Sequence, residues 1–144
     1  MKLKLVFLMF FSGFCSAEEF YIGFQIEAFS RGGLIAGYEF NDKNSVELHL
    51  NGPGHVLSYG ISYKNHYSEK NYLILGYTNQ YWFNVVEGST TIQHGLNLGI
   101  GHEFGSRENG KWSYPVEIGG GPGYDPENKQ WRPLFFLGYG AIYN

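Results

Sequence analysis

The sequence predicts an all-β chain: an eight-stranded antiparallel up-and-down transmembrane β-barrel. The first sign is alternation at period two, as in LNLGIGHEFG at 96–105, because successive side chains of a strand leave opposite faces. The second sign is composition. The chain has 21 glycines, 19% aromatic and only 16% charged residues, which is unusual for a soluble enzyme, whose strands avoid glycine. The third sign is that residues 18–144 contain no apolar run long enough for a transmembrane helix.

Residues 1–17 are expected to be a signal peptide. MKLK is basic, LVFLMFFSGF is apolar, and CSA ends in a small residue before Glu18. The apolar run is too short to span a bilayer as a helix. We therefore expect cleavage after Ala17 and a mature, exported domain of residues 18–144, with a retained anchor or a buried first strand as the alternatives.

Removing the signal peptide changes the charge and the cysteine content. Lys2, Lys4 and Cys15 leave, so eight basic residues face thirteen acidic ones, a formal net charge of about −5. The cysteine-free remainder excludes disulfides, thiolate metal sites and a cysteine nucleophile. The acidic balance argues against a nucleic-acid partner, which needs basic patches.

Eight segments follow the strand pattern, and turn clusters such as NDKN and NGPG separate them. The predicted strands are 20–29, 34–40, 45–50, 56–64, 72–78, 96–105, 112–120 and 133–143. Two longer segments, 79–91 and 119–130, are predicted to be loops on the external side. The even hairpin spacing predicts a single meander without a domain boundary.

Interior volume decides which face of these strands points inward. About thirty large or apolar side chains lie on one face, whereas an eight-stranded barrel is only just wide enough to be filled by side chains. The glycine-rich polar face is therefore predicted to point inward and the bulky face outward. An outward apolar face is tolerated only in lipid, where a closed barrel leaves no backbone group unpaired. A soluble lipocalin-like barrel or sandwich stays open as an alternative, because the second and third strands are short for a membrane.

The chain resembles the small eight-stranded outer-membrane β-barrel proteins of Gram-negative bacteria. YPVEIGGGPGY at 114–124 is similar to their proline-led, glycine-rich seventh strand. The last strand is similar to their C-terminal assembly signal up to Tyr143, although Asn144 follows where the family usually ends on the aromatic residue. The resemblance implies an outer-membrane location. Members include structural, adhesive and resistance proteins and lipid A-modifying enzymes, so the fold does not choose an activity.

The inward face collects charged side chains that we interpret as a polar network plugging the barrel. These residues are Glu27, Glu39, Glu47, His49, Lys64, Glu103 and Glu117. Lys64, with Arg132 or Lys111, would supply the positive charge that crowded carboxylates need. The alternative is a proton or cation path, or an acid–base pair.

No segment predicts a catalytic, metal or cofactor site. The His-x-Ser-Asn motif of lipid A deacylases is absent, and His102 and Glu103 fall on opposite faces of one strand, the wrong geometry for an orienting pair. The five histidines lack the close spacing of a zinc site. GIGHEFG and GGGPG have no following helix to bind a phosphate.

The predicted external segment 79–91 carries an aromatic cluster, Tyr81, Trp82 and Phe83. It suits contact with a ligand, partner or headgroup, with simple packing over the barrel mouth as the alternative. We expect a monomer surrounded by membrane lipid, with lipopolysaccharide or a surface partner at the loops and a structural or interaction role. The alternatives are a lipid A-modifying acyl hydrolase or transferase and a soluble periplasmic ligand-binding barrel.

Overall fold

The computed structural model describes residues 19–27, 32–52, 56–84, 86–106 and 110–143; the predicted signal peptide lies outside these ranges. The described residues form eight strands and no helix. The strands are β1 (Glu19–Glu27), β2 (Gly33–Asn41), β3 (Asn44–Asn51), β4 (Val56–His66), β5 (Asn71–Asn84), β6 (Ser89–Gly105), β7 (Trp112–Asp125) and β8 (Gln130–Tyr143). No helix that could cross a membrane occurs in this part of the chain.

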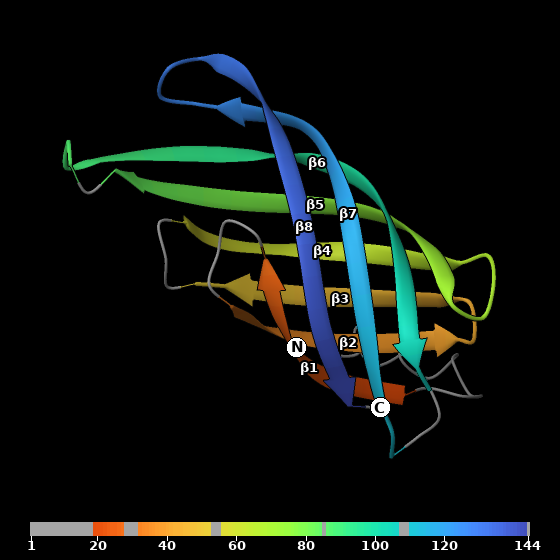
Figure 1. Ribbon diagram of the computed structural model, residues 1–144. Coiled ribbons are helices and arrows are strands. Elements are labelled where there is room, and N and C mark those ends of the chain that lie inside the picture. The colour runs from red at the N-terminus through yellow and green to blue at the C-terminus, as the bar shows by residue number, and fades with distance from the viewer. Residues whose placement is uncertain (1–18, 28–31, 53–55, 85, 107–109, 144) are drawn as a thin grey trace, which may run out of the picture.

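Each strand pairs antiparallel with the next, and β1 pairs with β8, so the sheet is a closed ring (Figure 1). The eight antiparallel up-and-down strands predicted from the sequence are thereby confirmed. Tyr143 of β8 lies beside Ile22 of β1. We call the end of the ring where β1 begins and β8 finishes the terminal end, and the opposite end the far end.

The bulky face of the strands points outward, as predicted. In the middle of β6, the exposed fractions of Leu96, Leu98 and Ile100 are 59%, 65% and 54%. Asn97 and Glu103, on the other face, are buried in the interior of the ring. The soluble alternative required the reverse arrangement, with the apolar side chains converging on a dry core.

Glycines make room for the aromatic side chains that lie inside the closed sheet. Tyr21 lies directly opposite Gly37 on the neighbouring strand, and Tyr72 lies opposite Gly101. A β-carbon at either glycine would overlap the facing tyrosine ring. At these two places the interior holds a large ring because the adjacent strand carries no side chain.

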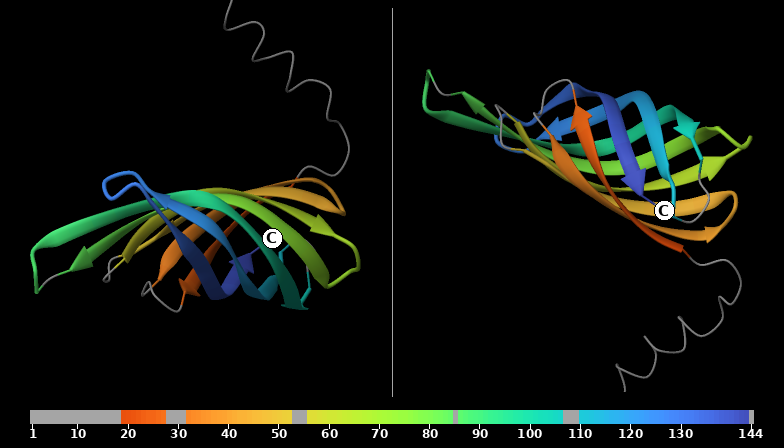
Figure 2. Two further views of the ribbon diagram at one scale, coloured as in Figure 1. Left: turned by 90° about the horizontal axis from the view of Figure 1, so that it is seen from above. Right: turned by 60° about the horizontal axis from the view of Figure 1, so that its bottom comes forward.

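The prediction that 79–91 is a loop is wrong. Most of this segment extends β5 and β6, which pair from Asn71↔His102 as far as Asn84↔Ser89. Three consecutive aromatic residues hide the alternation on β5, but the β-branched residues of β6 opposite them favour a strand. Figure 2 shows the green β5–β6 hairpin reaching beyond the other hairpins at the far end.

The prediction that 119–130 is a loop is also wrong. β7 continues to Asp125 and pairs with β8 as far as Asp125↔Gln130, leaving only a short turn. Proline normally interrupts a central strand because it has no N–H to donate. The β6–β7 pairing is interrupted between Gly95↔Gly123 and Leu98↔Gly120, and Pro122 falls in that gap, where it does not stop pairing with β8.

The ring is uneven in height. β1, β2 and β3 have 9, 9 and 8 residues and β4 has 11, whereas β5 to β8 have 14 to 17. The long hairpins overhang the far end, while the β1–β3 wall is short (Figure 1).

Candidate functional site

The interior contains a three-membered ion cluster made by β3, β4 and β7. Lys64 Nζ lies 2.8 Å from Glu47 Oε2 and 2.6 Å from Glu117 Oε1. All three side chains are at least nine-tenths buried. One ammonium group is therefore shared by two carboxylates, and the attraction is strong because little water screens it.

Two tyrosines complete the cluster from opposite sides. The Tyr21 hydroxyl donates a hydrogen bond of 3.1 Å to Glu47 Oε2, and the Tyr72 hydroxyl donates one of 2.6 Å to Glu117 Oε1. Each bonded carboxylate oxygen thus faces one hydroxyl and the Lys64 ammonium. Because Tyr21 is on β1 and Tyr72 on β5, the cluster ties together five strands of the ring.

The strand pattern could have revealed both tyrosines. Tyr21 is two residues before Gly23, and Tyr72 is four residues before Gly76, so each shares the inward face of its strand. Their size is typical of the outward face, so these two rings were not predicted to lie in the interior.

The remaining predicted network residues are spread along the interior. His49 lines a central cavity together with Glu47 and Glu117. Glu39 and Glu103 line a second cavity nearer the terminal end. Glu27 belongs to β1, but its side chain lies outside the described residues. Of the two other predicted counter-charges, Arg132 is at the far end beside Asp125, and Lys111 is exposed before β7.

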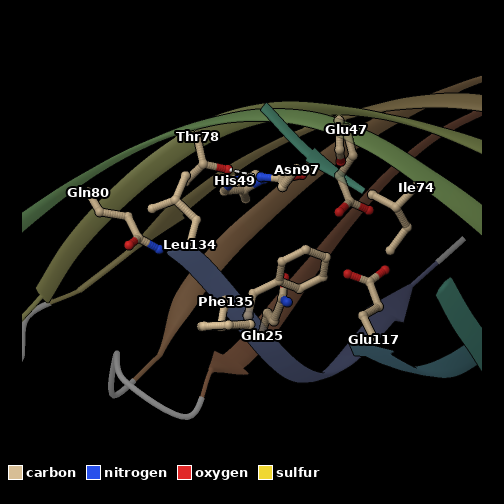
Figure 3. A pocket seen from close by; sticks show the side chains of 12 residues that line it. Gln25, Glu47, His49, Ile74, Thr78, Gln80, Asn97, Glu117, Leu134 and Phe135 are labelled. Atoms are coloured by element: carbon tan, nitrogen blue, oxygen red, sulfur yellow. Dashed lines mark hydrogen bonds between the residues drawn. The ribbon is translucent and has the colours of Figure 1, made fainter. Parts of the chain in front are cut away.

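The two interior cavities lined by described residues leave no room for a small-molecule substrate. Figure 3 shows Glu47 and Glu117 at one side of the central cavity and the bonded pair Thr78 and Asn97 above it. This cavity has a volume of about 30 Å³, and the one nearer the terminal end has about 10 Å³. A water molecule needs roughly 10–15 Å³ by the same measure. The central cavity therefore holds about two or three waters and the other about one.

A serine, a histidine and an acid do meet inside the ring, at the cavity nearer the terminal end. Ser45, His66 and Glu103 all line it, and His66 Nε2 lies 3.7 Å from Glu103 Oε2. The Ser45 hydroxyl makes no hydrogen bond to His66, so the contact that activates a serine nucleophile is missing. The serine is 1% exposed in a water-sized space, and this arrangement does not support hydrolysis.

The aromatic cluster predicted on an external loop lies on β5 instead. Tyr81 and Phe83 are on the outward face and Trp82 is on the inward face, near the far end. The Tyr81 ring stacks on Tyr59 of β4 with centroids 6.0 Å apart. The three residues therefore form no single contact surface.

The described ranges contain no group of three or more histidine, cysteine or acidic side chains arranged to hold a metal ion. Comparisons of the chain with protein-family models, with curated proteins and with solved structures find no match.

Proposed function

We propose that this protein is a small outer-membrane β-barrel that is plugged by its own side chains and acts through its far-end hairpins, as a structural or surface-interaction protein. The observation that carries the proposal is an outward belt of exposed aliphatic side chains. It includes Ile22, Leu34, Leu48, Leu50, Ile61, Leu73, Leu75, Leu96, Leu98, Ile100, Ile118 and Leu137. Water would strongly disfavour so continuous an apolar surface, whereas acyl chains would match it.

Aromatic side chains border this belt at both ends of the ring. At the terminal end, ring contacts join Phe20 to Tyr38, Tyr38 to Phe40, His102 to Phe104 and Trp112 to Tyr143. At the far end, they join Tyr59 to Tyr81, Tyr77 to His94, His94 to Tyr124 and Tyr124 to Trp131. Two girdles of amphipathic rings around an apolar band are typical of barrels whose ends lie at headgroup level.

The interior supports a closed barrel instead of a channel. The Glu47–Lys64–Glu117 cluster crosses it, and the cavities on either side are water-sized. Ions would need to displace buried ion pairs to pass, which is costly. A plugged interior leaves the surfaces outside the membrane as the places where a partner could bind.

The projecting β5–β6 hairpin is the best candidate for partner contact. β6 pairs with β7 only from His94 onward, so no strand in the described part of the chain pairs with that edge of Ser89–Gln93. The apolar tip residue Val86 is 96% exposed, and Glu87 is the only charged residue between 79 and 93. An uncharged, unpaired edge can accept an added strand from another protein.

Fractionation tests the membrane location. The protein produced in a Gram-negative host is expected in the outer-membrane fraction, extracted only by detergent and migrating faster before boiling than after it. Recovery of folded protein from the periplasm without detergent would contradict the proposal.

The lipid A acyl pattern tests the enzyme alternative. This pattern, measured by mass spectrometry, is expected to be the same with and without the protein, whereas a changed pattern would favour the enzyme alternative.

Surface labelling tests the orientation. Because the only cysteine is Cys15, Val86→Cys gives a single target in the mature chain. An impermeant maleimide is expected to label it on intact cells. The matched control is Glu69→Cys in the exposed β4–β5 turn at the terminal end, which should react only after the outer membrane is permeabilised. The reverse labelling pattern would invert the proposed topology.

The β7–β8 turn lies beyond the far-end girdle, and its order is expected to depend on pH. Asp125 Oδ1 accepts hydrogen bonds from the backbone N–H groups of Glu127 and Asn128, both at 3.0 Å. Its other oxygen, Oδ2, accepts a hydrogen bond of 2.9 Å from Asn128 Nδ2. The side-chain bond from Asn128, then its backbone bond, lower the pKa of Asp125 below its usual value. The ionised carboxylate therefore stabilises the turn above the ordinary aspartate pKa, and this stabilisation is lost as the pH falls through the lower pKa of the folded state.

Amide exchange followed by NMR checks this turn. The Glu127 and Asn128 amides are expected to lose protection as the pH is lowered through the acid range, after correction for intrinsic exchange. In Asp125→Ala they should be unprotected at every pH. Unchanged protection in that variant would show that the carboxylate does not order the turn.

A further inference from the structure

The outer face of the ring is hollowed over its short wall. One hollow of about 640 Å³ lies over β1, β2 and β3 and is lined by side chains that include Ile22, Ala36, Leu48, Trp112 and Tyr143. A second, of about 490 Å³, continues it toward the far end. The two share lining residues on all three strands, so they form one groove, which we call the β1–β3 groove.

The strand register explains why a groove forms on a surface that curves outward. Ala36 is paired with Ile22 on one side and with Leu48 on the other. Two residues further along each strand, toward the far end, Phe24, Leu34 and Leu50 form a row of large side chains. The small Ala36 side chain therefore forms the bottom of the groove, and the larger apolar side chains around it form its sides.

The terminal-end mouth of the groove carries groups that suit a lipid headgroup. The rings of Trp112 and Tyr143 lie 5.3 Å apart there. Indole and phenol groups favour the headgroup level. An apolar groove with an aromatic mouth at that level matches one acyl chain of a membrane lipid.

The short strands give lipid a further reason to occupy this face. At about 3.3 Å per residue and a tilt of roughly 40°, eight residues rise only about 20 Å, against a hydrocarbon core of about 30 Å. The membrane beside β1–β3 must therefore thin, or its chains must bend. A groove that accepts one chain along the wall would accommodate part of that mismatch.

We propose that the β1–β3 groove is a binding site for one acyl chain of a glycerophospholipid. This inference rests on the membrane location proposed above. The groove's mouth is at the terminal end, which the proposed topology places in the inner leaflet, where glycerophospholipids reside. A second copy of this chain or a lipid A chain are the competing occupants.

Fluorescence quenching of Trp112 tests the site. In Trp82→Phe/Trp131→Phe, Trp112 is the only tryptophan. Folded protein in detergent micelles is titrated with trace amounts of a phospholipid brominated on its acyl chains. Quenching is expected to saturate near one lipid per protein. Quenching that only rises in proportion to the lipid fraction would overturn the proposal.

Filling the groove gives the matched comparison. Ala36→Phe in the same background is expected to remove the saturable phase, whereas Leu98→Phe on β6, outside the groove, should leave it intact. Equal curves for both variants would contradict the site, as would preferential quenching by brominated lipid A. A dimer in detergent that Ala36→Phe dissociates would assign the groove to a second copy.

Two kinds of failure are distinguishable. A protein that folds without detergent would overturn the membrane proposal itself, whereas failed saturation in a detergent-dependent protein overturns only the lipid site.

Discussion

Replacing Lys64 with methionine is expected to destabilise the folded protein by roughly 3–5 kcal/mol, because it leaves two buried carboxylates without their shared counter-charge. Glu47 and Glu117 lie within 2.8 Å of the ammonium and are almost completely buried. Methionine keeps most of the side-chain volume, so the loss reports charge and not a cavity. Urea unfolding from lipid vesicles, followed by tryptophan fluorescence, measures the change in unfolding free energy.

Two further variants separate the charge cluster from a general effect. Glu47→Gln/Lys64→Met/Glu117→Gln removes all three charges while keeping their shapes, and should recover at least half of the loss. Lys43→Met, on the exposed β2–β3 turn, should change stability by no more than about 0.5 kcal/mol. The deficit of Lys64→Met should also shrink at acid pH, where protons neutralise the carboxylates. An equal deficit in the single and triple variants would show that the ion cluster does not stabilise the ring.

Gly121→Ala is expected to cost about 3 kcal/mol, or to prevent the ring from closing, because strands β6 and β7 approach too closely there for a side chain. A methyl group at Gly121 would overlap the carbonyl oxygen of Leu96 on β6. A backbone oxygen cannot rotate away as a flexible side chain can. Electrophoresis of unboiled samples gives the folded fraction, and urea unfolding gives the free energy.

Gly140→Ala is the matched control on the same inward face. Its added methyl group would lie 3.1 Å from the Phe24 carbonyl oxygen and from Pro115 Cγ. A shift of a few tenths of an ångström relieves such contacts, so the expected cost is about 1 kcal/mol or less. Similar losses in the two variants would mean that backbone approach at Gly121 is not what limits substitution.

The sequence was sufficient for the strand number, their order and the direction of each face. These depend on a period of two, which Leu96, Leu98 and Ile100 show clearly. Charged residues followed the same rule, so the pattern predicted that Glu47, Lys64 and Glu117 lie inside. Their positions in the sequence do not give the register between strands. That Lys64 lies between the two carboxylates therefore could not be derived before the strand pairing was known.

The long hairpins were harder to predict because local signals there oppose the sheet. Tyr81, Trp82 and Phe83 in succession hide alternation, and a glycine- and proline-rich run around Pro122 resembles a turn. Pairing across the ring overrides both, since each strand gains hydrogen bonds that the isolated segment does not offer. The inward positions of Tyr21 and Tyr72 were missed because their size suggested the outer face, whereas a facing glycine provides the space.

Spin labelling along β6 tests the central claim that the apolar face meets lipid. Single cysteines at Asn97, Leu98 and Ile100, in mature protein reconstituted into vesicles, carry a nitroxide whose collisions with oxygen and with a nickel chelate are compared. Labels at Leu98 and Ile100 are expected to collide mainly with oxygen, which concentrates in the hydrocarbon core, and the label at Asn97 to be shielded from both. Preferential collision of the Leu98 and Ile100 labels with the water-soluble chelate would contradict the account.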